Sequence, residues 1–187
     1  MAINYPHVER VLFVIGRQRA GKSTLLRQMF VDPRFARRGS ATKSKRGQAH
    51  VRLSPGLCLH IRYASPHEWG DTLEEFFAKI DDERRRRSHN YWRFNFACAL
   101  QPTQENNMPG IVETCRAFQK RFDPERIRVV QISPRQDKRT HDEDILSSNS
   151  IDQLRRLGVE FATIDGRRET FKQATNGWLL ADFFNYI

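Results

Sequence analysis

The chain has 187 residues, of which 39% are hydrophobic, so it is long and apolar enough for one folded domain with a single core. Lys and Arg outnumber Asp and Glu by 32 to 22, and the resulting net charge of +10 attracts phosphates, nucleic acids or anionic lipids without defining a fold. No apolar stretch approaches the roughly 20 residues that cross a bilayer, and Met1–Asn4 do not begin an export signal. We therefore expect a cytoplasmic protein with one domain, residues 1–187, and no membrane span.

The first part of the chain predicts a strand, a helix and a basic loop. Arg10–Ile15 is a continuous apolar run, which is typical of a strand that is covered on both faces. Apolar side chains then recur at helical spacing until Asp32, where Pro33 ends the pattern. The segment 34–48 has no periodicity and no acidic residue, and we expect it to be an exposed loop. Its six basic residues are Arg34, Arg37, Arg38, Lys43, Lys45 and Arg46.

The rest of the chain alternates strands with helices. The predicted strands, of which the first two form a hairpin, are His50–Leu53, Leu57–Tyr63, Tyr91–Leu100, Ile127–Ile132 and Val159–Ile164. Helices are indicated by capping boxes at Thr72–Glu75 and Ser150–Gln153, by an apolar stripe from Ile111 to Phe122, and by the aromatic segment Thr170–Ile187. This alternation predicts an α/β fold, with helices on both faces of a mainly parallel sheet and one antiparallel edge strand from the hairpin.

The most specific motif follows directly after the first predicted strand. Eight consecutive residues match G-x-x-x-x-G-K-[ST] in full: Gly16, Arg17, Gln18, Arg19, Ala20, Gly21, Lys22 and Ser23. In a P-loop the glycines let the backbone wrap around an anion, the lysine places a charge on the β- and γ-phosphates, and the serine hydroxyl is a ligand of Mg²⁺. A buried strand before the motif and a helix after it provide the required context. The motif predicts a three-layer P-loop NTPase fold that binds GTP or ATP with Mg²⁺, Thr24 being included in the site.

The order of elements resembles that of small G proteins and translation-factor-type GTPases over nearly the whole chain. In that family a threonine in the loop after the first helix binds Mg²⁺. The best positional match here is Thr42, with Thr24 and Ser40 as alternatives. The family also changes the conformation of its loops with the bound nucleotide. The resemblance therefore implies a switch whose nucleotide state is read by a protein partner.

The hydrolysis and base-recognition motifs of that family are degenerate in this chain. The segment Tyr63–Glu68 stands where the family has Asp-x-x-Gly-His-Glu, and His67 matches the residue that orients the attacking water. The family's aspartate and glycine are replaced by Tyr63 and by Pro66, which has no amide hydrogen to offer a phosphate. Pro134–Asp137 stands in place of Asn-Lys-x-Asp and leaves Asp137 to bond the guanine edge. The resemblance thus implies a GTPase-like switch or NTPase whose hydrolysis is slow or depends on a partner.

The carboxylate that supports Mg²⁺ through water is expected at the end of a strand beside the P-loop strand. Glu68 and Asp71 come several residues after their strand, whereas Asp165 directly follows an apolar run that we place at the far edge of the sheet. The sequence leaves the choice among these three open.

A second basic cluster, Arg84–Arg87, leaves two other functions open. A P-loop kinase would use these arginines as a lid and transfer the γ-phosphate to a nucleotide, a nucleic-acid end or a small metabolite. A basic nucleic-acid-binding module with a vestigial P-loop would use them on phosphates, with Tyr91 and Trp92 as stacking groups. The structural alternative is a solvated helix end that is favoured by the helix dipole.

Overall fold

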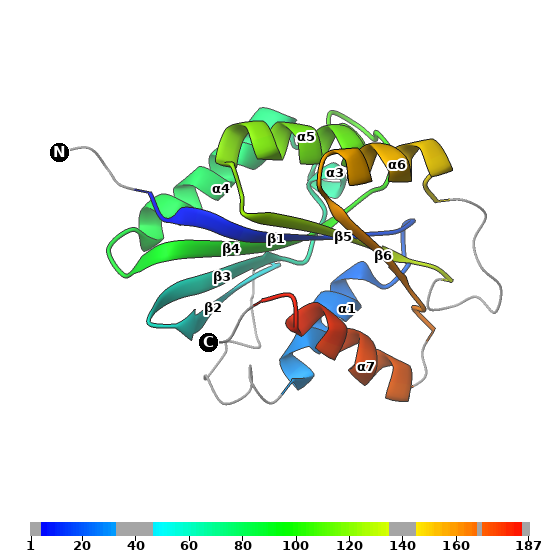
Figure 1. Cartoon of the computed structure of the whole chain (residues 1–187), viewed down its shortest axis with the longest axis horizontal. Coiled ribbons are helices and arrows are strands. Elements are labelled where there is room, and N and C mark those ends of the chain that lie inside the picture. Colours follow the sequence, from blue (N-terminus) through cyan, green and yellow to red (C-terminus); the bar gives the residue numbers. More distant parts are fainter. Residues whose placement is uncertain (1–4, 33–46, 135–144, 168–169, 185–187) are drawn as a thin grey trace.

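Six strands in the described part of the chain form one sheet in the order β2-β3-β4-β1-β5-β6 (Figure 1). The computed structural model describes residues 5–32, 47–134, 145–167 and 170–184. The strands are β1 (His7–Ile15), β2 (Gln48–Ser54), β3 (Gly56–Arg62), β4 (Tyr91–Leu100), β5 (Arg126–Ile132) and β6 (Glu160–Ile164). Every neighbouring pair is parallel except β2 and β3, which form the hairpin at one edge. The predicted mainly parallel sheet with one antiparallel edge strand is confirmed.

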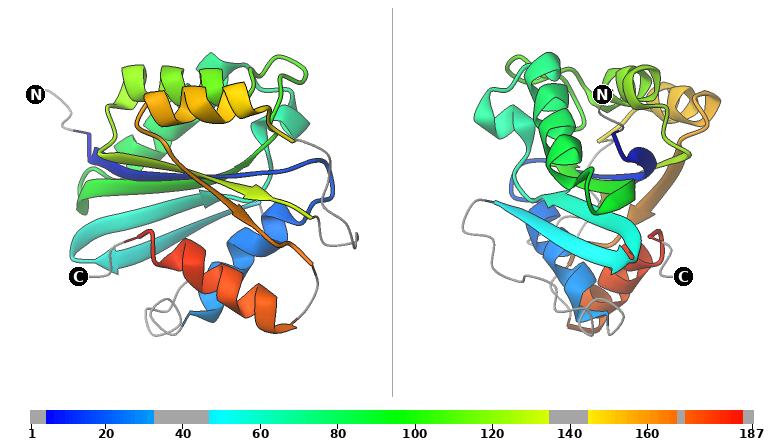
Figure 2. Two further views of the ribbon diagram at one scale, coloured as in Figure 1. Left: turned by 45° about the vertical axis from the view of Figure 1, so that its right-hand side comes forward. Right: turned by 90° about the vertical axis from the view of Figure 1, so that its left-hand side faces the viewer.

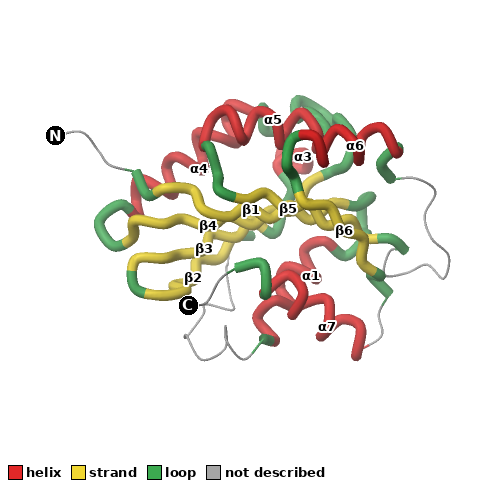
Figure 3. The backbone as a smooth tube through the Cα atoms, in the orientation of Figure 1, coloured by secondary structure: helices red, strands yellow, loops and turns green. Residues whose placement is uncertain are grey.

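Helices cover both faces of this sheet and give the molecule three layers (Figures 1 and 3). One face carries α3 (Pro66–Trp69), α4 (Leu73–Arg87), α5 (Ile111–Phe122) and α6 (Ser148–Arg156), and the other carries α1 (Lys22–Gln28), its short extension η1 (Met29–Val31) and α7 (Thr170–Ala181). The two rotated views keep this division (Figure 2). Within the described part of the chain, no helix has both the length and the apolar character needed to cross a membrane.

Strand β1 lies in the middle of the sheet and contributes to both cores. Its residues 11–15 are fully buried. Phe13 points toward the helical layer of α4 and α5, where its ring meets Phe118 edge-on with the centroids 5.5 Å apart. Leu12 and Val14 point to the opposite core beneath α1 and α7. A strand with apolar side chains on both faces must be covered twice, so the apolar run already places β1 inside the sheet.

Two predicted helix boundaries have different outcomes. The capping box at the start of α4 is confirmed, because Glu75 N donates to Thr72 Oγ1 and Thr72 N donates to the Glu75 carboxylate. The second capping box is wrong. Helix α6 begins three residues earlier than predicted, since the hydroxyl of Ser147 accepts from Ser150 N at 3.2 Å and places Ser150 in the first turn. The α3 turn was not predicted, and the C-terminal helix ends at Ala181.

Helix α7 crosses α1 at a glycine. A Cβ atom on Gly177 would lie 2.3 Å from Gln28 O and 2.7 Å from Gln28 C, so the two backbones meet at this point. Exposed glycine-to-alanine changes inside helices normally stabilise by about 1 kcal/mol. Gly177→Ala should instead destabilise by about 1–3 kcal/mol, because α7 has to move away from α1. Urea denaturation measures this, with the half-exposed Leu179→Ala on the same helix as the control; a stabilised Gly177→Ala protein would contradict the packing.

Candidate functional site

The segment that matches the P-loop motif, Gly16–Ser23, is called the P-loop below and lies at the carboxyl edge of the sheet, where β1 ends and α1 begins. Gly16 is needed for close packing, because a Cβ atom there would lie 3.0 Å from Ala20 Cβ. Gly21 has φ +98°, a left-handed conformation that glycine adopts without strain, and it directly precedes the first residue of α1. The turn is closed by Ala20 N donating to Arg17 O at 3.1 Å. The segment therefore forms a closed turn between β1 and α1.

A hollow of about 390 Å³ opens over this loop. It is lined by Gln18, Arg19, Ala20, Gly21, Lys22, Ser23, Thr24 and Glu68. Seven of these residues belong to the P-loop segment, and six of them are in the predicted phosphate-binding set of eight. Glu68 is the one lining residue from elsewhere in the described chain, and it comes from α3. The P-loop and α3 are therefore the two walls of the site.

Lys22 is 5% exposed and holds the P-loop from within. Its ammonium group donates to Gly16 O at 2.8 Å and to Arg17 O at 3.0 Å, and it lies 3.5 Å from Gln101 Oε1 at the end of β4. Burial lowers the pKa of Lys22 to about 8, and the negative charges of Glu68 and Glu105 partly offset this effect. A buried cation with a lowered pKa is stabilised by any anion that enters the hollow.

Ser23 connects the P-loop to the segment that follows β3. Its hydroxyl donates to Tyr63 O at 2.7 Å, and a hydroxyl that donates its proton retains its lone pairs for a metal ion. Tyr63 N in turn donates to Gly47 O at 2.9 Å, and the Arg27 guanidinium lies over the Tyr63 ring, 4.5 Å from its centroid. Tyr63 thus contacts both the P-loop and the residue preceding β2.

The strands beside β1 do not supply the expected carboxylate. The neighbours of β1 are β4 and β5, which are followed by Gln101 and Ser133. Strand β3, which leads to Glu68, is separated from β1 by β4. The carboxylate that lines the hollow, Glu68, therefore follows the second strand from β1 and not a direct neighbour of β1. It lies on the short helix α3, beside the P-loop.

Of the three carboxylates considered for Mg²⁺, only Glu68 lines the hollow. Asp71 is buried between Arg62 at 3.2 Å and Lys79 at 2.5 Å, and Asp165 forms a two-pronged ion pair with Arg167. No group of three His, Cys, Asp or Glu side chains in the described ranges is arranged to hold a metal on its own. The hydroxyl of Ser23 and the carboxylate of Glu68, which both line the hollow, are oxygen ligands of the kind that Mg²⁺ prefers.

His67 is packed into the fold next to this site. It is 1% exposed, its Nε2 lies 3.1 Å from Pro109 O, and its Nδ1 lies 3.1 Å from Ser65 Oγ. Because a carbonyl only accepts, Nε2 donates to Pro109 and Nδ1 accepts from the Ser65 hydroxyl. Burial lowers the pKa of His67, which favours this neutral form. Nε2 thus holds α3 against the loop after β4, Nδ1 is engaged by the N-cap residue of α3, and neither nitrogen is available to orient a water.

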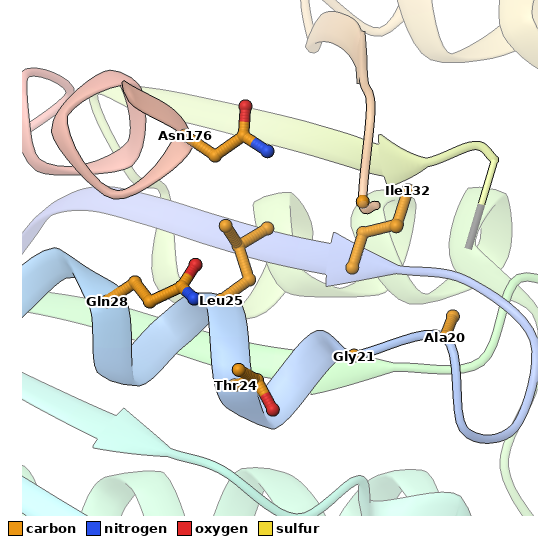
Figure 4. A pocket seen from close by; sticks show the side chains of 8 residues that line it. Ala20, Gly21, Thr24, Leu25, Gln28, Ile132 and Asn176 are labelled. Atoms are coloured by element: carbon orange, nitrogen blue, oxygen red, sulfur yellow. The ribbon is translucent and has the colours of Figure 1, made fainter. Parts of the chain in front are cut away.

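A second, much smaller slot lies between α1, α7 and the end of β5 (Figure 4). Its volume is about 20 Å³, and its lining residues are Ala20, Gly21, Thr24, Leu25, Gln28, Ile132, Gly166 and Asn176. That volume is close to the space for one water molecule. Gly166 closes it tightly, since a Cβ atom there would lie 2.3 Å from Ile132 Cγ2. A phosphate group is too large for this slot, and Thr24 lies on the border between the slot and the larger hollow.

Arg84–Arg87 lie far from the P-loop. Arg84 donates to Pro6 O with Nε at 3.1 Å and Nη2 at 2.9 Å, so the cluster sits where β1 begins, whereas the P-loop follows its end. Strand β1 has nine residues and spans about 27 Å. The hypothesis that these arginines form a lid over the P-loop is therefore wrong for a single chain. Thr42, Asp137 and the basic residues of segment 34–46 lie outside the described residues.

Comparisons with known proteins add nothing to this geometry: no protein-family profile, no curated protein and no solved structure matches the chain. Two residues near the site were missed by the sequence predictions. Gln101 and the exposed Glu105 follow β4, and both act on Lys22. The sequence does predict the strand Tyr91–Leu100 that precedes them. It does not predict that this strand lies beside β1, and that neighbourhood is what brings the two residues close to Lys22.

Proposed function

We propose that this protein binds a nucleoside triphosphate, GTP or ATP, with Mg²⁺ in the hollow over Gly16–Ser23. The observation that carries the proposal is the buried ammonium group of Lys22, which lies at the centre of a complete P-loop and faces a hollow of about 390 Å³. A buried cation is stabilised when an anion pairs with it, and the backbone of the surrounding loop leaves room for a chain of phosphates. The three-layer α/β fold with the loop at the carboxyl edge of a parallel sheet agrees with a P-loop NTPase.

Each residue then has a distinct part in binding. Lys22 exchanges its contacts with Gly16 O and Arg17 O for phosphate oxygens. Ser23 provides a hydroxyl lone pair for the metal while it keeps its hydrogen bond to Tyr63 O. The Glu68 carboxylate repels a bare phosphate tail, so it favours one that carries Mg²⁺ or an intervening water. Bound Mg²⁺ would neutralise phosphate charge and orient the γ-phosphate.

A switch is supported by the position of Tyr63. Its carbonyl and amide groups connect Ser23 with Gly47, and the turn that follows it carries Glu68. A movement of Ser23 on nucleotide binding would therefore be transmitted to Gly47, before the hairpin, and to the turn with Glu68, after it. With Glu68 as the one carboxylate that lines the hollow in the described chain, and with both nitrogens of His67 engaged, we expect hydrolysis to be slow or to depend on a partner.

Nucleotide affinity should fall at alkaline pH because of Lys22. The pKa of Lys22 is about 8 in the free protein, and bound phosphates raise it, so binding takes up a proton above pH 8. The affinity at pH 9.5 should be about 10- to 30-fold weaker than at pH 7.5. Calorimetric titration over this range tests the expectation. Lys22→Arg, whose guanidinium stays charged, should flatten the profile of any remaining binding, and a flat wild-type profile would contradict the assignment.

The proposal as a whole is tested by displacement of a fluorescent triphosphate in the presence of Mg²⁺. We expect ATP, GTP and inorganic tripolyphosphate to compete, and AMP to compete far more weakly, because the phosphate tail supplies most of the contacts. The ratio of the ATP and GTP affinities identifies the base. If neither nucleotide displaces the probe at millimolar concentration, the proposal is wrong.

A further inference from the structure

A second hollow lies at the edge of the sheet opposite the P-loop, and it is aromatic. It has a volume of about 270 Å³ and is lined by Tyr5, Pro6, His7, Ser88, Tyr91 and Trp92. Three of the six lining residues are Tyr or Trp, and two are strongly exposed: Trp92 at 65% and Tyr5 at 39%. Exposed aromatic rings that gather in one hollow mark a candidate interaction site.

The Trp92 ring is fixed in position by the β2–β3 turn. A Cβ atom on Gly56 would lie 2.2 Å from two of the indole carbons, so the ring rests directly on the glycine backbone. Gly56 also has φ +75°, a left-handed conformation that glycine adopts without strain, so both the space and the backbone favour glycine here. An indole that is supported underneath and largely exposed is a preformed platform, because little side-chain freedom remains to be lost when a ligand stacks on it.

Tyr5 and Pro6, on the other side of this hollow, are held in place by Arg84. Its guanidinium donates twice to Pro6 O and lies 5.3 Å from the centroid of the Tyr5 ring. Tyr91 is held from below by His50, whose ring meets it edge-on with centroids 5.5 Å apart. Contacts with the fold therefore hold the aromatic side chains of the hollow in place.

The surroundings of the hollow carry a surplus of positive charge. The segment 81–93 contains five arginines and three acidic residues. The side chains of Arg85 and Arg86 are 54% and 67% exposed in the last turn before Ser88, and Arg93 pairs in register with His7. Both arginines form ion pairs within one helix, Arg85 with the half-exposed Asp82 and Arg86 with Glu83, whose side chain is 13% exposed. Such pairs contribute little stability, and each leaves most of the five guanidinium donors available to phosphates.

We propose that this hollow is a binding site for single-stranded nucleic acid, independent of the P-loop. Bases stack on the exposed face of Trp92, opposite the face that rests on Gly56, and between the tyrosines, while Arg85 and Arg86 contact the phosphates beside them. A single strand is required, because a duplex hides the faces of its bases. The net charge of +10 favours the same polyanion over a neutral or basic partner.

The test is fluorescence anisotropy of labelled 12-nucleotide single strands of DNA and RNA, with a duplex of the same length as the comparison. Trp92→Ala should weaken single-strand binding about 5- to 100-fold. Trp92→Phe keeps a ring over Gly56 and should retain most of the affinity, which separates lost stacking from misfolding. The matched control is Trp178→Ala, a tryptophan that is 46% exposed on α7 and should leave binding unchanged.

Charge and independence are tested by two further variants. Arg86→Ala should weaken binding modestly and reduce the slope of log affinity against log salt by about one unit. Lys22→Ala, which removes the proposed nucleotide site, should leave single-strand binding unchanged. The proposal is overturned if single strands bind no more tightly than the duplex, if Trp92→Ala behaves like Trp178→Ala, or if poly-glutamate displaces the oligonucleotide at the same charge concentration.

Discussion

Lys22→Ala should reduce the affinity for Mg²⁺–ATP or Mg²⁺–GTP by about 100-fold or more, because it removes the buried charge that we propose pairs with the phosphates. The ammonium group is desolvated before the ligand arrives, as its pKa of about 8 reflects. Its attraction to a phosphate is therefore offset only weakly by loss of hydration. Isothermal titration calorimetry at pH 7.5 measures the loss.

Arg17→Ala is the matched control for this change. Arg17 lies in the same loop and has the same charge, but it is exposed and does not line the hollow. Its substitution should change the affinity less than about threefold, as expected for an exposed charge. Equal losses in the two variants would mean that the net charge of the loop, and not the buried position of Lys22, attracts the nucleotide.

Glu68→Gln should abolish most of the benefit that Mg²⁺ gives to nucleotide binding. In the wild type the carboxylate lines the hollow and repels the phosphate tail unless a cation lies between them. The variant should bind metal-free nucleotide more tightly than the wild type does, and the gain in affinity on adding Mg²⁺ should fall about tenfold. Any hydrolysis should fall about 100-fold, since no other carboxylate lines the hollow in the described chain.

Glu105→Gln is the control that distinguishes a direct role of Glu68 in Mg²⁺ dependence from the loss of any negative charge near Lys22. Glu105 also raises the pKa of Lys22, but it is exposed and does not line the hollow. Its substitution should leave the Mg²⁺ dependence unchanged. The role of Glu68 is refuted if titrations with and without Mg²⁺ give the same ratio of affinities for wild type and Glu68→Gln.

The features that depend on local chemistry were predictable from the sequence. The P-loop is contiguous, and its glycines fall where a close approach and a positive φ occur. The apolar run of β1 and the capping box at Thr72 also follow from neighbouring residues. In the second box Ser147 was missed, because the three serines Ser147, Ser148 and Ser150 offer several equivalent caps.

The features that depend on the order of strands were not predictable. The rule that a carboxylate comes from a neighbour of β1 is sound only when that neighbour is known, and here β4 lies between β1 and β3. Glu68 reaches the P-loop because α3 turns back over the sheet edge, with His67 anchored to Pro109 O. His67 matches a catalytic position in the sequence, but in the structure its side chain holds α3 in place.

The most direct test of the central claim is nuclear magnetic resonance of the ¹⁵N-labelled chain with Mg²⁺ and a non-hydrolysable GTP or ATP analogue. If Gly16–Ser23 hold the phosphate tail, saturable shifts should be largest at the amides of Gly21, Lys22 and Ser23, with smaller shifts at Tyr63 and at the Gln101 side chain. Lys22→Ala should remove them. Saturable shifts confined to another part of the protein, or none at millimolar nucleotide, would contradict the account.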